Sequence, residues 1–140
     1  MTLFHQGHLL SNAIASLRNG LITNRLSCTV HRTEGMFRFL QLLRKHSLIY
    51  GYVDQPQRDR IVVYLRYRYG KSVLQGLRQV SVPGRRRYVT GKDLHSKRRF
   101  RPTLLYILKN KQGLQTFGQQ NPNLVYKRGT RFGELLCTVW

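Results

Sequence analysis

Residues 48–69, LIYGYVDQPQRDRIVVYLRYRY, decide the fold of the first half of the chain. Within this stretch, residues 60–69 alternate between a set of apolar and tyrosine side chains and a set in which arginines are concentrated. Successive side chains of a strand point to opposite faces, so this period of two predicts a strand with one half-exposed face. Residues 48–53 predict a partner strand, and residues 54–59, which contain Pro56, predict the hairpin loop between them.

The residues before this hairpin predict two helices and one strand. Apolar residues recur at spacings of three and four across residues 9–21, which predicts a helix that ends near Gly20. Residues 26–30 predict a short strand, and Thr33 predicts the start of a second helix. The inward face of that helix is expected to contain Met36, Phe37, Leu40 and Leu43. With the hairpin, these elements form an N-terminal αβαββ domain, expected at residues 1–70.

The second half of the chain predicts mostly strands. Apolar segments separated by turn signals such as Pro83-Gly84 indicate strands at residues 73–82, 87–90, 103–109 and 135–139. Thr116 and Gln119 have the spacing of a capping box, which predicts a short helix there. The expected fold class is therefore α+β, with a second domain at residues 71–140 that is rich in β-structure and contains short helices.

Charge is the strongest signal in the composition. The 140 residues include 25 Lys+Arg and 5 Asp+Glu, which gives a net charge of +20, and the second half carries more of this charge than the first. Hydrophobic residues make up 41% of the chain, so it can bury a core and disorder is disfavoured. A polyanionic partner, usually nucleic acid, relieves such self-repulsion. The prevalence of arginine favours RNA, because guanidinium groups contact phosphate in a bidentate manner and stack on bases.

The same composition excludes several kinds of chemistry. The five carboxylates are spread along the chain and leave little for a carboxylate-dependent hydrolase or a two-metal site. Cys28 and Cys137 have apolar neighbours and lie too far apart in sequence to form a CxxC pair, so we interpret them as core residues. A triad of Cys28, His31 and Glu34 has only proximity in sequence to support it. We therefore expect no enzyme activity, no metal, no cofactor, no transmembrane segment and no secretory signal.

Three clusters in the second half are suited to contact RNA. The first follows a Pro-Gly turn and places three arginines beside an aromatic ring that can stack on an unpaired base. It comprises Pro83, Gly84, Arg85, Arg86, Arg87 and Tyr88. The second repeats this basic and aromatic pattern around Arg98 and Arg99. The third is a polar loop able to hydrogen-bond base edges and sugar hydroxyls, and it comprises Lys109, Asn110, Lys111, Gln112 and Gly113. A solvated charge run is the alternative for the first cluster, and an ordinary turn for the third.

The order of four motifs resembles the universal ribosomal protein S8 family of the small subunit, in its bacterial and organellar form. The motifs extend from about residue 8 to residue 140 and are Leu17-Arg18-Asn19-Gly20, Tyr64-Leu65-Arg66-Tyr67, Val82 to Tyr88 and Gly133 to Trp140. The resemblance implies a two-domain, non-enzymatic protein that binds the central domain of small-subunit ribosomal RNA and contacts neighbouring ribosomal proteins. The predicted RNA-binding set therefore also includes Arg18, Asn19, Gly133 and Glu134. Glu134 is expected to accept a base amine or to make a structural hydrogen bond.

The chain also departs from the family pattern. A family loop of pattern Ser-Thr-Ser-x-Gly aligns with residues 109–113, where the glycine is kept and the three hydroxyls are absent. The two lysines of this loop are expected to contact phosphate in place of the hydroxyl hydrogen bonds. A basic insertion at about residues 121–130 contributes Lys127 and Arg128 to the predicted RNA-binding set. Such drift favours a mitochondrial ribosome, with a plastid or the bacterial cytoplasm as the alternative location. No long Arg/Ser-rich transit peptide precedes the first predicted helix, which favours organelle encoding or a bacterial source. The competing class is a non-ribosomal RNA-binding module, such as a translational repressor or an RNA chaperone, and no membrane or small-molecule partner is expected.

Overall fold

The strand predicted from the period of two buries one set of its side chains. In the computed structural model of the chain, β3 (Arg60–Leu65) buries Ile61, Val63 and Leu65, whereas the side chain between the last two, Tyr64, stays 42% exposed. One face of the sheet is therefore in the core, and the other is accessible.

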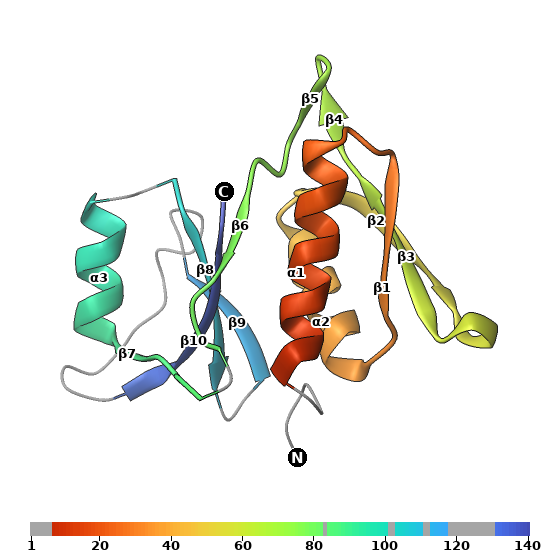
Figure 1. Cartoon of the computed structure of the whole chain (residues 1–140). Coiled ribbons are helices and arrows are strands. Elements are labelled where there is room, and N and C mark those ends of the chain that lie inside the picture. The colour runs from red at the N-terminus through yellow and green to blue at the C-terminus, as the bar shows by residue number, and fades with distance from the viewer. Residues whose placement is uncertain (1–6, 83, 101–102, 111–112, 118–130) are drawn as a thin grey trace. The chain divides into compact units, whose positions relative to one another are not determined.

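β3 is the central strand of a three-stranded antiparallel sheet with the order β1-β3-β2 (Figure 1). It pairs with β1 (Ser27–His31) on one side and with β2 (Ile49–Gln55) on the other. The expected hairpin loop between β2 and β3 contains a short 3-10 helix, Pro56–Arg58. The structure describes residues 7–82, 84–100, 103–110, 113–117 and 131–140.

Two helices cover the buried face, with α1 (Gly7–Ile22) against β1 and α2 (Glu34–Lys45) against β2. The first helix ends at Ile22, two residues beyond the Gly20 near which its end was expected, so Gly20 lies within α1, where it permits close packing. A Cβ at Gly20 would lie 3.3 Å from Cδ1 of Leu65.

The start of α2 is confirmed, because the side chain of Thr33 accepts a hydrogen bond of 3.1 Å from the Met36 backbone N–H. Its buried face is shifted from the expected one. Phe39 is fully buried and the expected Phe37 only half-buried. The buried positions Met36, Phe39, Leu40 and Leu43 follow the i, i+3, i+4, i+7 spacing of one helix face.

The strand expected to reach residue 69 ends at Leu65. The chain continues as a small hairpin of β4 (Tyr67–Arg68) and β5 (Lys71–Ser72), in which Tyr69 and Gly70 have positive φ. Residues 70 and 71 therefore lie within a hairpin. The chain divides into two compact units, Met1–Leu77 and Arg78–Trp140. The boundary between these units follows Leu77, whereas the domain boundary was expected at residue 70.

The C-terminal sheet has the strand order β6-β10-β8-β9, with β7 also paired to β10. β10 is antiparallel to β7 and β8, and β8 is antiparallel to β9. The strands are β6 (Leu77–Gln79), β7 (Tyr88–Thr90), β8 (Leu105–Asn110), β9 (Gly113–Phe117) and β10 (Arg131–Val139). β6 is shorter than the strand expected at residues 73–82. Together with the N-terminal elements, this sheet confirms the α+β class.

The helix expected at Thr116 is wrong. Thr116 lies in β9, is buried, and pairs with Ile107 of β8, so the cross-strand pairing overrides the local capping pattern. A helix that the sequence reasoning missed, α3 (Gly91–Phe100), precedes β8 instead.

A capping box between Thr90 and Asp93 opens α3. Oδ2 of Asp93 accepts hydrogen bonds from the Thr90 backbone N–H (3.1 Å) and from Thr90 Oγ1 (2.9 Å), and the Asp93 N–H donates to Thr90 Oγ1 (3.3 Å). The hydrogen bond from the Thr90 backbone N–H, and after it the bond from the Thr90 side chain, lower the pKa of Asp93. Leu94 anchors α3 in the core of this unit, which comprises Val89, Leu94, Tyr106, Leu108, Phe117 and Leu135.

Cys28 and Cys137 are both free and buried, which confirms their interpretation as core residues. Burial raises the pKa of the Cys28 thiol to about 11 and that of the Cys137 thiol to about 12. Both thiols are therefore protonated and unreactive near neutral pH.

Candidate nucleic-acid interface

One row of the C-terminal sheet joins three segments that are far apart in sequence. Glu134 of β10 lies opposite Tyr88 of β7 on one side and opposite Lys109 of β8 on the other. Residues directly opposite in antiparallel strands have Cα atoms about 4.5–5.5 Å apart and side chains on the same face. The row Tyr88–Glu134–Lys109 therefore brings together members of the arginine cluster, the C-terminal motif and the polar loop.

The arginine cluster lies on a tight turn directly before β7. Val82 and Arg85 exchange backbone hydrogen bonds of 3.0 and 3.3 Å, and Gly84 between them has φ +83°. A non-glycine residue rarely adopts this φ, which explains the glycine of the turn. Arg85, Arg86 and Arg87 are exposed. The Leu135 N–H donates a 2.8 Å hydrogen bond to the Arg87 carbonyl, which anchors the turn to β10. Pro83 lies outside the described residues.

The carboxylate of Glu134 organises this turn from within the protein. Its side chain is only 12% exposed. Oε1 accepts hydrogen bonds from Ser81 Oγ (2.5 Å) and from Nη1 of Arg86 (3.3 Å). Ser81 Oγ in turn accepts from the Arg87 backbone N–H (3.2 Å). Of the two roles expected for Glu134, the structural hydrogen bond is the one that the structure shows.

Replacing Glu134 with alanine is expected to lower the free energy of unfolding by about 1–3 kcal/mol, because Ser81 and Arg86 lose their acceptor at a mostly buried site. Faster amide hydrogen exchange at Arg87 and Leu135 is expected as well, since the turn is no longer anchored to β10. Urea unfolding and hydrogen exchange measure the two effects.

Glu34→Ala is the matched control. The Glu34 carboxylate is 77% exposed and forms an i,i+4 pair with Arg38, so its loss is expected to change stability by less than about 0.5 kcal/mol. Equal effects of the two substitutions would contradict an anchoring role for Glu134.

The polar loop is the turn of the β8–β9 hairpin. Asn110 pairs with Gly113, whose φ is +112°, and Asn110 Nδ2 donates a 2.8 Å hydrogen bond to Gln115 Oε1 across the hairpin. Lys111 and Gln112 lie outside the described residues. The carbonyl oxygen of Lys109 would be 2.6 Å from a Cβ at Gly133, so this glycine permits the close approach of β10 to β8.

The other predicted residues are not part of this row. Arg18 and Asn19 belong to the N-terminal unit, where Nη2 of Arg18 donates a 2.6 Å hydrogen bond to the Leu77 carbonyl. Arg98 and Arg99 lie on α3, but the structure does not describe their side chains. Lys127 and Arg128 lie outside the described residues altogether.

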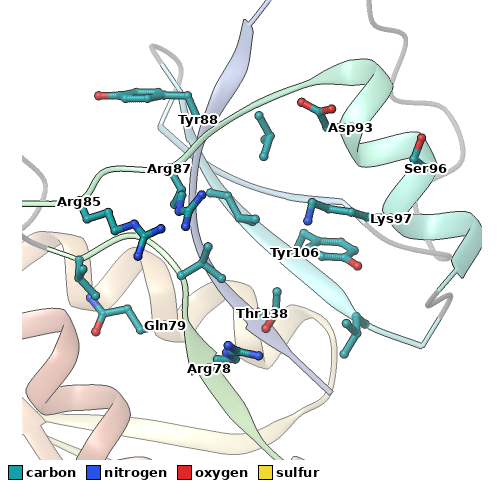
Figure 2. A pocket seen from close by; sticks show the side chains of 15 residues that line it. Arg78, Gln79, Arg85, Arg87, Tyr88, Asp93, Ser96, Lys97, Tyr106 and Thr138 are labelled. Atoms are coloured by element: carbon teal, nitrogen blue, oxygen red, sulfur yellow. The ribbon is translucent and has the colours of Figure 1, made fainter.

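Beside the turn, the C-terminal unit forms a groove of about 870 Å³ (Figure 2). Cations from separate elements line it, among them Arg78, Arg87 and Lys97. The sequence reasoning did not single out Arg78 or Ser81 as site residues. The sequence does indicate a special role for Ser81, because it is a lone hydroxyl between two valines in an apolar segment that ends at a Pro-Gly turn.

These features define a class of protein. A strongly basic α+β chain that presents exposed arginines beside a tyrosine is typical of nucleic-acid-binding proteins. Within the described part of the chain, no three His, Cys, Asp or Glu side chains gather as a metal site, and no helix is long and apolar enough to cross a membrane.

Comparison with known proteins identifies the family within this class. The Ribosomal protein S8 family matches residues 8–140. The chain is 30% identical over 136 residues to the small ribosomal subunit protein uS8 of Protochlamydia amoebophila, covering 94% of this chain and 96% of that protein. It is 28% identical over 131 residues to the small ribosomal subunit protein uS8m of Acanthamoeba castellanii, covering 94% and 98%. The chain belongs to the ribosomal protein S8 family of the small subunit, and it is not an enzyme.

Proposed function

We propose that this protein binds the central domain of small-subunit ribosomal RNA and thereby supports subunit assembly and translation. The observation that carries the proposal is the row Tyr88–Glu134–Lys109, because it places three separately predicted RNA-binding segments side by side. Neighbouring small-subunit proteins are its expected protein partners.

Phosphate contacts supply most of the affinity in this proposal. Arg85, Arg86 and Arg87 are exposed on the turn, and the adjacent ring of Tyr88 is 57% exposed, so it presents a surface on which an unpaired base can stack. Because the Glu134 carboxylate is bound by Ser81 and Arg86, its contribution is to hold the arginine turn in place.

The two lysines of the polar loop test the proposal directly. Replacing Lys109 and Lys111 with alanine is expected to weaken binding to a central-domain RNA fragment by about 1–3 kcal/mol, the scale of charge-assisted hydrogen bonds. A filter-binding titration measures this loss. Unchanged affinity would show that the loop is not in the interface.

The salt dependence of wild-type binding tests the electrostatic part. If about six phosphates are neutralised, the logarithm of the binding constant falls against the logarithm of the salt concentration with a slope of about −4 to −5. A slope near zero would contradict phosphate-dominated binding.

Sedimentation separates the ribosomal function from a non-ribosomal RNA-binding module. Stoichiometric comigration with the small ribosomal subunit is expected. A free or substoichiometric pool would favour the translational repressor or RNA chaperone.

We also propose that the ribosome concerned is mitochondrial. The similarity to the uS8m protein and the altered polar loop support this location, while similarity to several bacterial uS8 proteins keeps the bacterial cytoplasm as the alternative. Cell fractionation followed by mass spectrometry of the purified mitochondrial small subunit provides the test. Recovery only with cytoplasmic or plastid ribosomes would overturn it.

A further inference from the structure

We propose that the groove of the C-terminal unit holds one unstacked nucleotide of the bound RNA, with its base over the apolar floor and its phosphate on the cationic rim. This inference rests on the proposed function, because it assumes that RNA is the partner. It adds a nucleotide site to the contacts at the Tyr88–Glu134–Lys109 row.

The groove has the size and the floor that a base needs. Its volume of about 870 Å³ lies within the range of small-molecule sites, about 300–1,000 Å³. Apolar side chains form the floor, namely Val80, Val89, Leu104, Tyr106 and Leu135. All five belong to, or pack on, the core cluster of this unit, so the floor is supported from below. Burying the face of a base against such a floor is favourable, because apolar surface leaves water.

The rim has the charge that a phosphate needs. Arg85 and Arg87 lie on one side of the groove, and Lys97 projects from α3 on the other (Figure 2). Arg78 of β6 adds a further cation to the lining of the groove. Asp93 is the sole carboxylate among the described lining residues, and it is engaged with Thr90 in the capping box of α3. The rim is therefore strongly positive.

The combination of floor and rim favours a nucleotide over other ligands. Inorganic phosphate leaves the apolar floor in water, and an apolar ligand leaves the cations without a counter-charge. The side chains of Ser96 and Thr138 add hydrogen-bonding groups that suit the polar edge of a base. An acidic peptide satisfies the rim, but it places no planar ring over the floor.

The groove adjoins the row at Tyr88, which belongs to the row and also lines the groove. In β10, the groove residue Leu135 directly follows Glu134 of the row. The arginine turn contributes to both places, because Arg87 lines the groove and bonds through its backbone to Ser81 and Leu135. An RNA bound at the row therefore has a nucleotide site within reach across the same turn.

The test is an NMR titration of the full chain with uridine 5′-monophosphate, which reads the methyl resonances of Val89, Leu104 and Leu135. Saturable shifts of these methyls are expected, and inorganic phosphate at the same concentration is expected to shift them much less. Lys97→Ala is expected to raise the dissociation constant for the nucleotide about 3- to 10-fold, through the loss of one partly exposed charge contact.

Lys92→Ala is the matched control, because Lys92 is an exposed lysine of the same helix that is not among the groove residues. It is expected to change the dissociation constant less than about twofold. An equal effect of the two substitutions would overturn the site, since it would indicate diffuse charge attraction. Absence of methyl shifts, or stronger shifts with hexaglutamate than with the nucleotide, would overturn it as well.

The two proposals fail in different ways. If the wild-type protein binds the central-domain RNA fragment but the nucleotide does not enter the groove, the inference is wrong and the proposed function stands. If the wild-type protein does not bind that RNA fragment, the proposed function itself is wrong.

Discussion

Replacing Gly133 with alanine is expected to lower the free energy of unfolding of the C-terminal unit by about 2–3 kcal/mol, the range of overpacked positions. The added Cβ would lie 2.6 Å from the Lys109 carbonyl oxygen and 3.2 Å from the carbonyl carbon. These are backbone atoms of the paired strand, so the contact can be relieved only by displacing β8 from β10. That displacement also separates Lys109 from Glu134, and weaker RNA binding is expected to accompany the loss of stability.

Urea unfolding followed by the fluorescence of Trp140 measures this effect, because Trp140 is the single tryptophan of the chain and follows β10 directly. Gly51→Ala is the control, since nothing lies within 4 Å of a Cβ at Gly51. Its effect is expected to stay within about 0.5 kcal/mol. A Gly133→Ala protein as stable as wild type would show that β8 and β10 accommodate the methyl group.

Replacing Arg85, Arg86 and Arg87 together with glutamine is expected to weaken binding to the central-domain RNA fragment by about 2–4 kcal/mol, or about 30- to 1,000-fold. The three guanidinium groups lie on one exposed turn beside Tyr88, so a single RNA backbone can contact them together. The salt slope is expected to become less negative by about 2–3, because each lost phosphate contact removes about 0.7–0.9 from it. Titrations at several salt concentrations measure both quantities.

The control is a triple substitution of Arg44, Lys45 and Arg58 with glutamine, which removes the same net charge from exposed positions of the N-terminal unit. A small, uniform loss of affinity is expected for this control. If both triple variants lose the same affinity, the binding depends on the total charge and not on the arginine turn. Circular dichroism establishes that each variant is folded, since Arg86 also pairs with Glu134.

Local patterns predicted most of the N-terminal unit. The period of two marked β3, and Thr33 marked the start of α2, because these signals depend on neighbours along the chain. The same reasoning failed at Thr116, where pairing with β8 decided the conformation. It also missed α3, which is polar along most of its length and buries Leu94 in the core.

Composition and hydrophobic periodicity by themselves determined that the protein is basic and α+β, because both are properties of the sequence alone. The order of its motifs added the resemblance to a ribosomal family. Only the tertiary structure decided that Tyr88, Glu134 and Lys109 form one row, since strand register depends on pairing between distant segments. It also decided that the Glu134 carboxylate is directed at Ser81 and Arg86, and that four cations surround an apolar groove. Such contacts arise when the chain folds back on itself, and no local pattern in the sequence specifies them.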